Sequence, residues 1–389
     1  STIPCRLDIS SICLFSFLSI EIYPEICLGL TRHEPFACDA AAGDATTLCE
    51  SFNQSLRPSN ESMLNEFLYR ITPRSYLFGK NWYLYLNFSK SLSVIDPKLK
   101  YNDYTGYYQV GNWKWRAWKR GGHGATDMKK SLVESANTYY YKFSDQIGYA
   151  PIVKTARDFG LGNVSGIDVP GEKKGIIPDP DWKKKRTKTV WYRGDTILLS
   201  IGQGFTLVTP IQLAKAYTFL ANKGWAYDPH VVSRIEDVQT GKIETVVTQK
   251  TVLTDYPASF YETINDALIA TVDQNNGTTK IMKNPYVKVA AKSGSAQNPH
   301  SKLTHAWVAG YFPADKETEV VFVCLLEGAG GGGVMAGGMA KRFLDKYLEV
   351  EKGIEPVKNT PIQPKIGETN GNIFPVLARA KPNVEDIPE

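Results

Sequence analysis

Two short polar segments carry residue types that could bind and process a peptide. The segment Lys292-Ser293-Gly294-Ser295 sets a cation and two hydroxyl groups around a glycine. Gly294 would let a substrate backbone lie close along a strand edge, where a side chain would collide. Ser293 and Ser295 could donate hydrogen bonds to a terminal carboxylate, and Lys292 would add positive charge nearby. A short K-[ST]-G tripeptide also occurs by chance.

The second segment is Ser135-Ala136-Asn137. In a loop or a first helical turn, Ser135 and Asn137 could point into one cleft, where the hydroxyl would help to shuttle a proton and the amide would bind a substrate amide bond. The alternative is a polar helix face with no such role. Serine enzymes that transfer acyl groups need both kinds of group, as well as a nucleophile.

The elements that must position these residues follow from local patterns. We expect a helix over 126–141, with Thr126 as the N-cap, and a second helix over 210–222, where Pro210 lies in the first turn. The β-branched run 287–291 predicts a short edge strand that ends in the Lys292 segment.

Two more strands are expected over 305–312 and 319–326, followed by a glycine-rich link, 328–338, and a last helix over 339–348. This order favours an α/β (α+β) sandwich in which helices flank an antiparallel sheet.

Composition divides the 389 residues into three zones. Residues 1–93 hold five of the six cysteines without regular periodicity, 94–350 alternate strand, helix and turn signals, and 351–389 form a proline-rich extension that we expect to be flexible. The apolar stretch within 12–30 is too short and too charged to span a bilayer. The net charge of +5 fits an envelope protein as well as a nucleic-acid binder.

Longer motifs give these segments a context. They are G-H-G at Gly122–Gly124, S-A-N-T-Y-Y-Y at Ser135–Tyr141, K-K-K-R at Lys183–Arg186 and A-A-K-S-G-S-A-Q at Ala290–Gln297. Together they resemble the transpeptidase domain of class B penicillin-binding proteins, and most of all the elongation-type penicillin-binding protein 2. The resemblance implies the penicilloyl-serine transferase (β-lactamase-like) fold over about 94–350.

The resemblance also implies a function. Such a protein is a peptidoglycan D,D-transpeptidase, whose serine attacks the D-Ala-D-Ala bond of a stem peptide and which β-lactams acylate. By the same resemblance Ser135, Asn137 and Lys292 are catalytic, and Ser293, Gly294 and Ser295 bind substrate. It implies no cofactor, a membrane glycosyltransferase of the elongation machinery as partner, and a place on the periplasmic face of the bacterial inner membrane.

The chain departs from the family at the nucleophile, which lies in an S-x-x-K element. No serine here is followed by lysine three positions later, and Gly79 and Trp82 stand at the matching places. Ser75 and Lys80 are the nearest substitute, but on a helix a spacing of five leaves side chains about 140° apart. We interpret 1–93 as a frameshifted or misassembled segment, with a divergent pseudoenzyme as the second interpretation.

Two other kinds of site are not expected. Some relatives carry a zinc site here, but only Asp103 and His123 match, with Ala117 and Ala136 at the other two positions. Two ligands do not make a structural zinc site, so His123 is expected to be a hydrogen-bonded loop residue. The basic run 183–186 is expected to be a solvated surface loop and not a nucleic-acid site.

The alternatives to an active transpeptidase are a catalytically dead protein that keeps the substrate groove, and a serine β-lactamase. A β-lactamase would share all three motifs but would need a further base to activate water. A nucleic-acid module is the remaining alternative. The size of the chain and its I-G-Q-G and T-P-I-Q segments, at 201–204 and 209–212, favour the transpeptidase.

Overall fold

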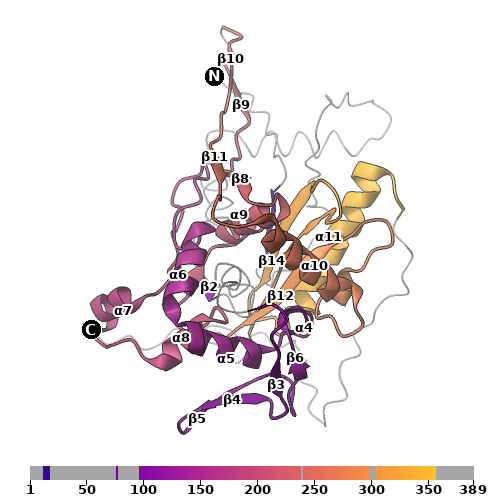
Figure 1. Ribbon diagram of the computed structural model, residues 1–389. Helices are drawn as coiled ribbons and strands as arrows, with labels where there is room; N and C mark the ends of the chain where they lie inside the picture. Colours follow the sequence, from indigo (N-terminus) through magenta and orange to yellow (C-terminus); the bar gives the residue numbers. More distant parts are fainter. Residues whose placement is uncertain (1–11, 18–75, 78–95, 238–239, 298–303, 356–389) are drawn as a thin grey trace, which may run out of the picture.

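The computed structural model describes residues 12–17, 76–77, 96–237, 240–297 and 304–355 (Figure 1). Its centre is a four-stranded sheet in the order β1-β14-β13-β12. The strands are β1 (Ile12–Phe17), β12 (Ala290–Ala296), β13 (His305–Phe312) and β14 (Val320–Leu326). The three later strands pair antiparallel, whereas β1 pairs parallel to β14.

Strands β12, β13 and β14 are buried on both faces of the sheet. Along β13, Trp307 and Tyr311 pack with the helices on one face, while Val308 and Phe312 pack with α11 (Met335–Lys352) on the other. Alternate residues of a strand point to opposite faces, so a strand covered on both sides has an almost continuous apolar sequence. This explains the runs H-A-W-V-A-G-Y-F and V-V-F-V-C-L-L.

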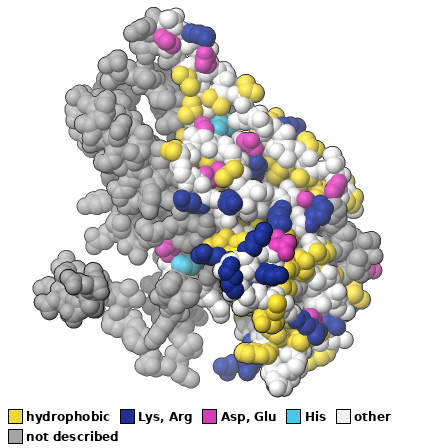
Figure 2. All heavy atoms as spheres, turned by 90° about the vertical axis from the view of Figure 1, so that its left-hand side faces the viewer, with side chains coloured by type: hydrophobic (Ala, Val, Ile, Leu, Met, Phe, Trp, Pro, Cys, Tyr) yellow, Lys and Arg dark blue, Asp and Glu magenta, His cyan; other side chains and the backbone are white. Residues whose placement is uncertain are grey.

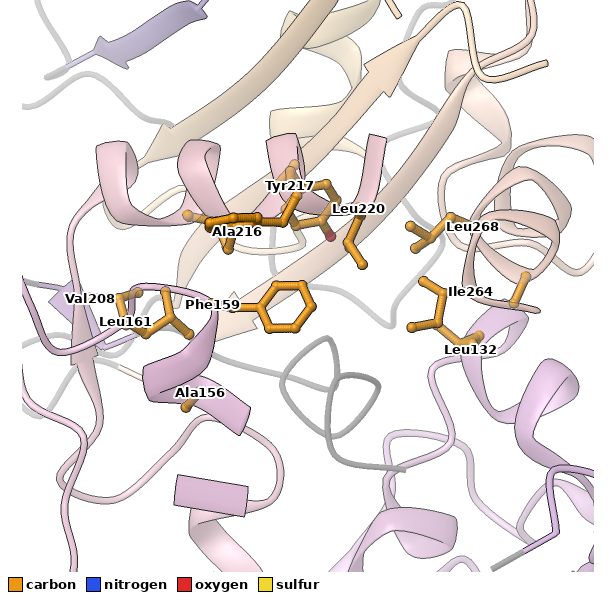
Figure 3. Packing of buried hydrophobic residues seen from close by; sticks show 14 of the residues in the cluster. Leu132, Ala156, Phe159, Leu161, Val208, Ala216, Tyr217, Leu220, Ile264 and Leu268 are labelled. Atoms are coloured by element: carbon orange, nitrogen blue, oxygen red, sulfur yellow. The ribbon is translucent and has the colours of Figure 1, made fainter. Parts of the chain in front are cut away.

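The larger core lies on the face opposite α11. It joins the sheet to α4 (Met128–Val133), α5 (Asn137–Ile147), α6 (Tyr149–Asp158), α8 (Arg193–Leu199), α9 (Pro210–Ala221) and α10 (Ala258–Asp273). In Figure 3, Phe159 lies below α9, and its ring centroid is 5.7 Å from that of Phe219. Ile264 of α10 faces Leu132 of α4 in the same view, which fixes α4 against α10.

Short two-stranded ribbons and small helices surround this centre. The ribbons pair β2 (Tyr76–Leu77) with β7 (Leu207–Val208), β3 (Tyr101–Asp103) with β6 (Gly124–Thr126), β4 (Tyr107–Val110) with β5 (Trp113–Arg116), β8 (Trp225–Tyr227) with β11 (Lys250–Val252), and β9 (Arg234–Glu236) with β10 (Ile243–Thr245). The remaining elements are α7 (Pro180–Thr187) and the 3₁₀ helix η3 (Lys280–Met282). The β4–β5 and β9–β10 ribbons project from opposite ends of the molecule (Figure 1).

Several predicted elements are confirmed. The antiparallel strands flanked by helices are present, β13 has the predicted limits, β14 begins one residue later than predicted, and α9 ends one residue earlier. Thr209 caps α9 through a hydrogen bond from the Gln212 backbone N–H, 3.3 Å long, while Pro210 occupies the first turn.

Other expectations were wrong in position. The helix over 126–141 is two helices, α4 and α5, and the cap of α4 is Asp127, whose carboxylate accepts the Lys130 N–H at 2.8 Å. Strand β12 contains the K-S-G segment, as expected, but it begins at Ala290 and not at 287, and it continues to Ala296. Helix α11 starts at Met335, inside the predicted glycine-rich link.

The basic run was also placed wrongly, because it is helical. Asp179 accepts the Trp182 N–H at 2.7 Å and so caps α7, and Pro180 starts the helix. The Asp-Pro pair thus marks the start of a short helix in a polar sequence. Within the described residues, no helix combines the length and apolar character needed to cross a bilayer.

Candidate active site

Ser135 lies at a sharp corner between two helices. Helix α4 ends at Val133 with Glu134 as its C-cap, α5 begins at Asn137, and the Ser135 backbone has φ 54°. A non-glycine residue in this left-handed region costs free energy and persists only when its surroundings hold it there. The Ala136 N–H donates to the Ser131 carbonyl at 2.8 Å and closes the turn. The corner turns the Ser135 side chain toward β12.

Lys292 meets that side chain from the sheet. Its Nζ donates to Ser135 Oγ at 3.2 Å and to the Ser293 carbonyl at 2.8 Å. Lys292 is only 2% exposed, so these hydrogen bonds take the place of water around a buried cation. The structure thus brings together two predicted residues that are 157 positions apart in the sequence.

The other residues of the K-S-G segment face the glycine-rich loop before α11. Since side chains alternate along a strand, Ser293 and Ser295 point away from the Lys292 side. The Gly332 N–H donates to Ser295 Oγ at 3.1 Å. A Cβ atom at Gly332 would lie 1.9 Å from the Gly294 carbonyl oxygen, so only glycine allows this approach. The sequence indicated Gly332 only as part of a link, and its contact with β12 was missed.

Asn137 carries a polar atom that has no hydrogen-bond partner among the described residues. Its Nδ2 donates to the Tyr141 hydroxyl at 3.2 Å, whereas its buried Oδ1 has no hydrogen-bond partner in the described part of the chain. The Thr278 hydroxyl is likewise buried and has no hydrogen-bond partner among the described residues. The Thr278 backbone N–H donates to the Val133 carbonyl at 3.1 Å, which ties it to the end of α4. Buried polar atoms are rarely left unpaired, and those that are suit a ligand.

Glu134, next to Ser135 in the chain, connects the corner to two other loops through hydrogen bonds. Its carboxylate oxygens lie 2.8 Å from His123 Nδ1 and 2.9 Å from Asn276 Nδ2. Burial alone would raise the pKa of Glu134, but these hydrogen bonds and the nearby Lys119 and Lys130 hold it below its usual value. Sequence reasoning missed Glu134 and Asn276, although an acidic residue directly before Ser135 was a visible signal.

Asp103 and His123, the two residues that match a zinc site in relatives, form hydrogen bonds with other residues of this chain. Asp103 accepts the Gly106 N–H at 2.8 Å and the Thr138 hydroxyl at 2.6 Å. His123 binds Glu134 and lies in a loop, as predicted. Among the described residues, no three His, Cys, Asp or Glu side chains are grouped as a metal site would require.

The predicted positions of the nucleophile lie outside the described residues. This holds for Gly79 and Trp82 and for the substitute pair Ser75 and Lys80. The structure therefore shows one half of a candidate site, made of the α4–α5 corner, β12 and the glycine-rich loop.

Comparison with known proteins decides the family. The family described as penicillin binding protein transpeptidase domain matches residues 92–346, nearly two thirds of the chain. This chain belongs to that family. Curated relatives include the peptidoglycan D,D-transpeptidases MrdA of Haemophilus influenzae, 35% identical over 70% of this chain and 44% of the relative, and of Acinetobacter baumannii, 31% identical over 69% and 41%.

Solved structures agree with the family. A crystal structure of Pseudomonas aeruginosa PBP2 is 28% identical and covers 76% of this chain and 67% of its own, with a TM-score of 0.64. PBP2 of Helicobacter pylori in complex with MreC is 25% identical and covers 77% and 54%, with a TM-score of 0.59. The penicilloyl-serine transferase fold and the resemblance to elongation-type class B proteins are thus confirmed.

This chain spans less than half the length of the curated relatives named above. Its domain limits at 94 and 350 and the roles of its six candidate site residues remain predictions.

Proposed function

We propose that this chain carries the transpeptidase domain of a peptidoglycan D,D-transpeptidase that cross-links stem peptides. The observation that carries the proposal is the 3.2 Å hydrogen bond from Lys292 Nζ to Ser135 Oγ, which joins the S-x-N and K-S-G segments at one corner. Family membership supports the class of reaction, and the contact between Ser135 and Lys292 supports the α4–α5 corner beside β12 as its site.

The reaction proceeds through an acyl-enzyme. A serine hydroxyl attacks the carbonyl carbon of the D-Ala-D-Ala bond, the C–N bond breaks, and D-alanine leaves with a proton on its amine. The amine of a second stem peptide then attacks the ester, forms the cross-link and returns the proton to the serine. Each step needs a group that can pass a proton at the right place.

Ser135 is suited to pass that proton. An ammonium group can only donate, so Ser135 Oγ accepts from Lys292, and the hydroxyl proton of Ser135 would pass to the leaving amine. Asn137 Oδ1, buried and without a partner in the described part, would accept the N–H of the substrate amide. Ser293 and Ser295 would hold the terminal carboxylate along the edge of β12.

A second candidate function is substrate binding without turnover. It is favoured by one observation, because the sequence contains no S-x-x-K element. Such a protein would keep the substrate groove and form no acyl-enzyme. The nucleophile of this chain is therefore left unassigned, and acylation is the property that separates the two candidates.

The proposal extends to the surroundings of the protein. One similar structure shows PBP2 of Helicobacter pylori with MreC, and another shows a peptidoglycan synthase complex that coordinates polymerization and crosslinking. By this likeness the partner is a membrane glycosyltransferase of the elongation machinery, and the domain works on the periplasmic face of the inner membrane. The ligands are D-Ala-D-Ala stem peptides and β-lactams, with no cofactor and no nucleic acid.

Equilibrium binding of a D-Ala-D-Ala peptide tests the proposed groove without requiring acylation. Isothermal calorimetry should show binding by the unaltered chain and a loss of at least about tenfold, about 1.4 kcal/mol, in Asn137→Ala. Asn102→Ala, which alters an exposed residue of β3, is the matched control and should bind normally. A folded chain that binds no peptide, or an equal loss in both variants, would refute the groove.

A further inference from the structure

Helix α7 and the residues after it form an exposed basic surface that the proposed reaction does not use. We define the α7 basic surface as Lys184, Lys185, Arg186 and Lys188 together with Val190 and Tyr192. We propose that this surface docks on an anionic lipid bilayer. The proposal is independent of the catalytic site and of whether the chain is acylated.

Within the described residues, no acidic side chain forms an ion pair with the cations of this surface. Lys184, Lys185, Arg186 and Lys188 are exposed, and no ion pair of the described chain includes any of them. Asp181 is the exposed acidic residue of α7 itself, so cations outnumber anions along the helix. Figure 2 shows Lys and Arg side chains gathered on the side of the molecule where α7 lies in Figure 1.

Two ion pairs fix helix α7 to helices α6 and α8. Lys183, buried within the basic run, donates to Asp195 of α8 at 2.5 Å, and Arg157 of α6 donates to Asp179 at 2.7 Å. The run is thus divided between one buried cation that fixes the helix and exposed cations that face solvent. A fixed helix presents its charges without a further ordering cost on binding.

Apolar side chains lie beside the exposed charges. Val190 is 60% exposed and Tyr192 is 59% exposed. Lys183 Nζ lies 4.6 Å from the centroid of the Tyr192 ring, which keeps this ring next to the helix. Basic residues next to exposed aromatic and aliphatic side chains are typical of surfaces that adsorb to anionic membranes, where the cations meet headgroups and the apolar groups enter the interface.

Two simpler explanations account for only part of this arrangement. Cations in the last turn stabilise the helix macrodipole, but the effect fades within that turn, whereas Lys188 already lies beyond the helix. A soluble polyanion would also bind the cations, but it would gain nothing from the exposed Val190. The bilayer accounts for the charges and the apolar side chains together.

Flotation with lipid vesicles tests the proposal on the full chain. Vesicles that contain about one third phosphatidylglycerol should bind the protein, and vesicles of phosphatidylcholine alone should not. Each cation near such a surface contributes about fivefold in partitioning, so Lys184→Ala with Lys185→Ala should weaken binding about 25-fold. Val190→Ser should weaken vesicle binding and leave binding to heparin, a soluble polyanion, unchanged.

The matched control also removes two exposed lysines. Lys242→Ala with Lys346→Ala makes the same change in net charge at 71% and 52% exposed positions away from α7, and should bind vesicles normally. Equal losses in both double variants would show a net-charge effect and overturn the proposal. Binding to heparin alone, or no binding to anionic vesicles, would overturn it as well. Peptide binding by the groove is expected to stay unchanged in all three variants, which separates this test from that of the proposed function.

Discussion

Ser135 shows how much of the candidate site depends on one backbone conformation. Its φ of 54° ends the helical path between α4 and α5 and turns the hydroxyl toward Lys292. The residues around it supply the support, since Glu134 is held on one side by His123 and on the other by Asn276. The corner therefore combines a conformation of unfavourable free energy with a buried hydrogen-bond network that maintains it.

Removal of the Glu134 carboxylate should destabilise the fold. Glu134→Ala leaves the buried Nδ1 of His123 without its partner, at a cost of about 1–3 kcal/mol in the free energy of unfolding, whereas the exposed Asn276 can turn to water. Urea unfolding followed by circular dichroism measures this cost. Glu262→Ala, an exposed position on α10, is the control and should change stability by less than about 0.5 kcal/mol. A Glu134 variant as stable as this control would contradict the supporting role.

The sequence singled out Ser135 and Lys292, which the structure brings together, but it did not indicate the shape of the corner that joins them. The polarity of 126–141 is compatible with one continuous helix, and nothing in it signals the positive φ of Ser135. The residue types at Ser135, Asn137 and Lys292 were informative because their chemistry does not depend on the exact path of the chain. Asn276 could not be found in advance, since it reaches Glu134 over 142 positions.

At the scale of elements, strong apolar runs were predicted well and polar elements poorly. Strand β13 has the expected limits because its residues are buried on both faces and leave no other assignment. Helix α7 was expected to be a loop because it has no apolar stripe, although Asp179 and Pro180 form a regular helix start. Tertiary anchoring by Lys183 and Asp195 makes this helix stable, and such pairing is not visible in a sequence.

The contact between the glycine-rich loop and β12 can be tested by adding one methyl group. Gly332→Ala would place Cβ 1.9 Å from the Gly294 carbonyl oxygen, so the loop or the strand must move, at a cost of about 1–3 kcal/mol. Peptide binding should fall in parallel. Gly331→Ala is the matched control, because a Cβ there meets nothing within 4 Å. Thermal unfolding of both variants provides the comparison, and equal melting temperatures would show that the approach of Gly332 is not required.

The buried ion pair beneath α7 should matter far more than its exposed neighbours. Lys183→Ala leaves the Asp195 carboxylate, 16% exposed, without its cation, which typically costs about 3–5 kcal/mol for a buried pair. Lys184→Ala changes an exposed residue one position away and should cost less than about 0.5 kcal/mol. Chemical denaturation of both variants measures the difference. Similar stabilities would mean that the pair does not anchor the helix.

At the scale of the whole molecule, buried carboxylates link the stability of the fold to pH. Burial alone would raise the pKa of Asp145, but hydrogen bonds from Arg193 and Tyr108 hold it below its usual value, and Glu134 is lowered in the same way. Such groups bind protons more tightly in the unfolded chain, so folding stability falls as they are protonated. Asp145 lies on α5 between the β4–β5 ribbon and α8, so its loss would loosen three elements together.

Stability is therefore expected to decrease on the acidic side. The contribution of Glu134 is complete above its unfolded-state pKa of 4.5, that of Asp145 above 3.8, and both are lost as the pH falls through the lower values of the folded state. Urea unfolding at a series of pH values between about 7 and 3 measures this slope. Asp145→Asn should flatten it, and a variant with an unchanged slope would contradict the assignment.

The most direct test of the central claim is covalent labelling of the purified chain with a fluorescent penicillin, followed by a denaturing gel and peptide mapping. If the corner of Ser135 and Lys292 belongs to a working transpeptidase site, the label survives denaturation, maps to one serine, and is lost in Lys292→Ala although that variant remains folded. A folded chain that takes no label would contradict an active transpeptidase and leave substrate binding without turnover as its function.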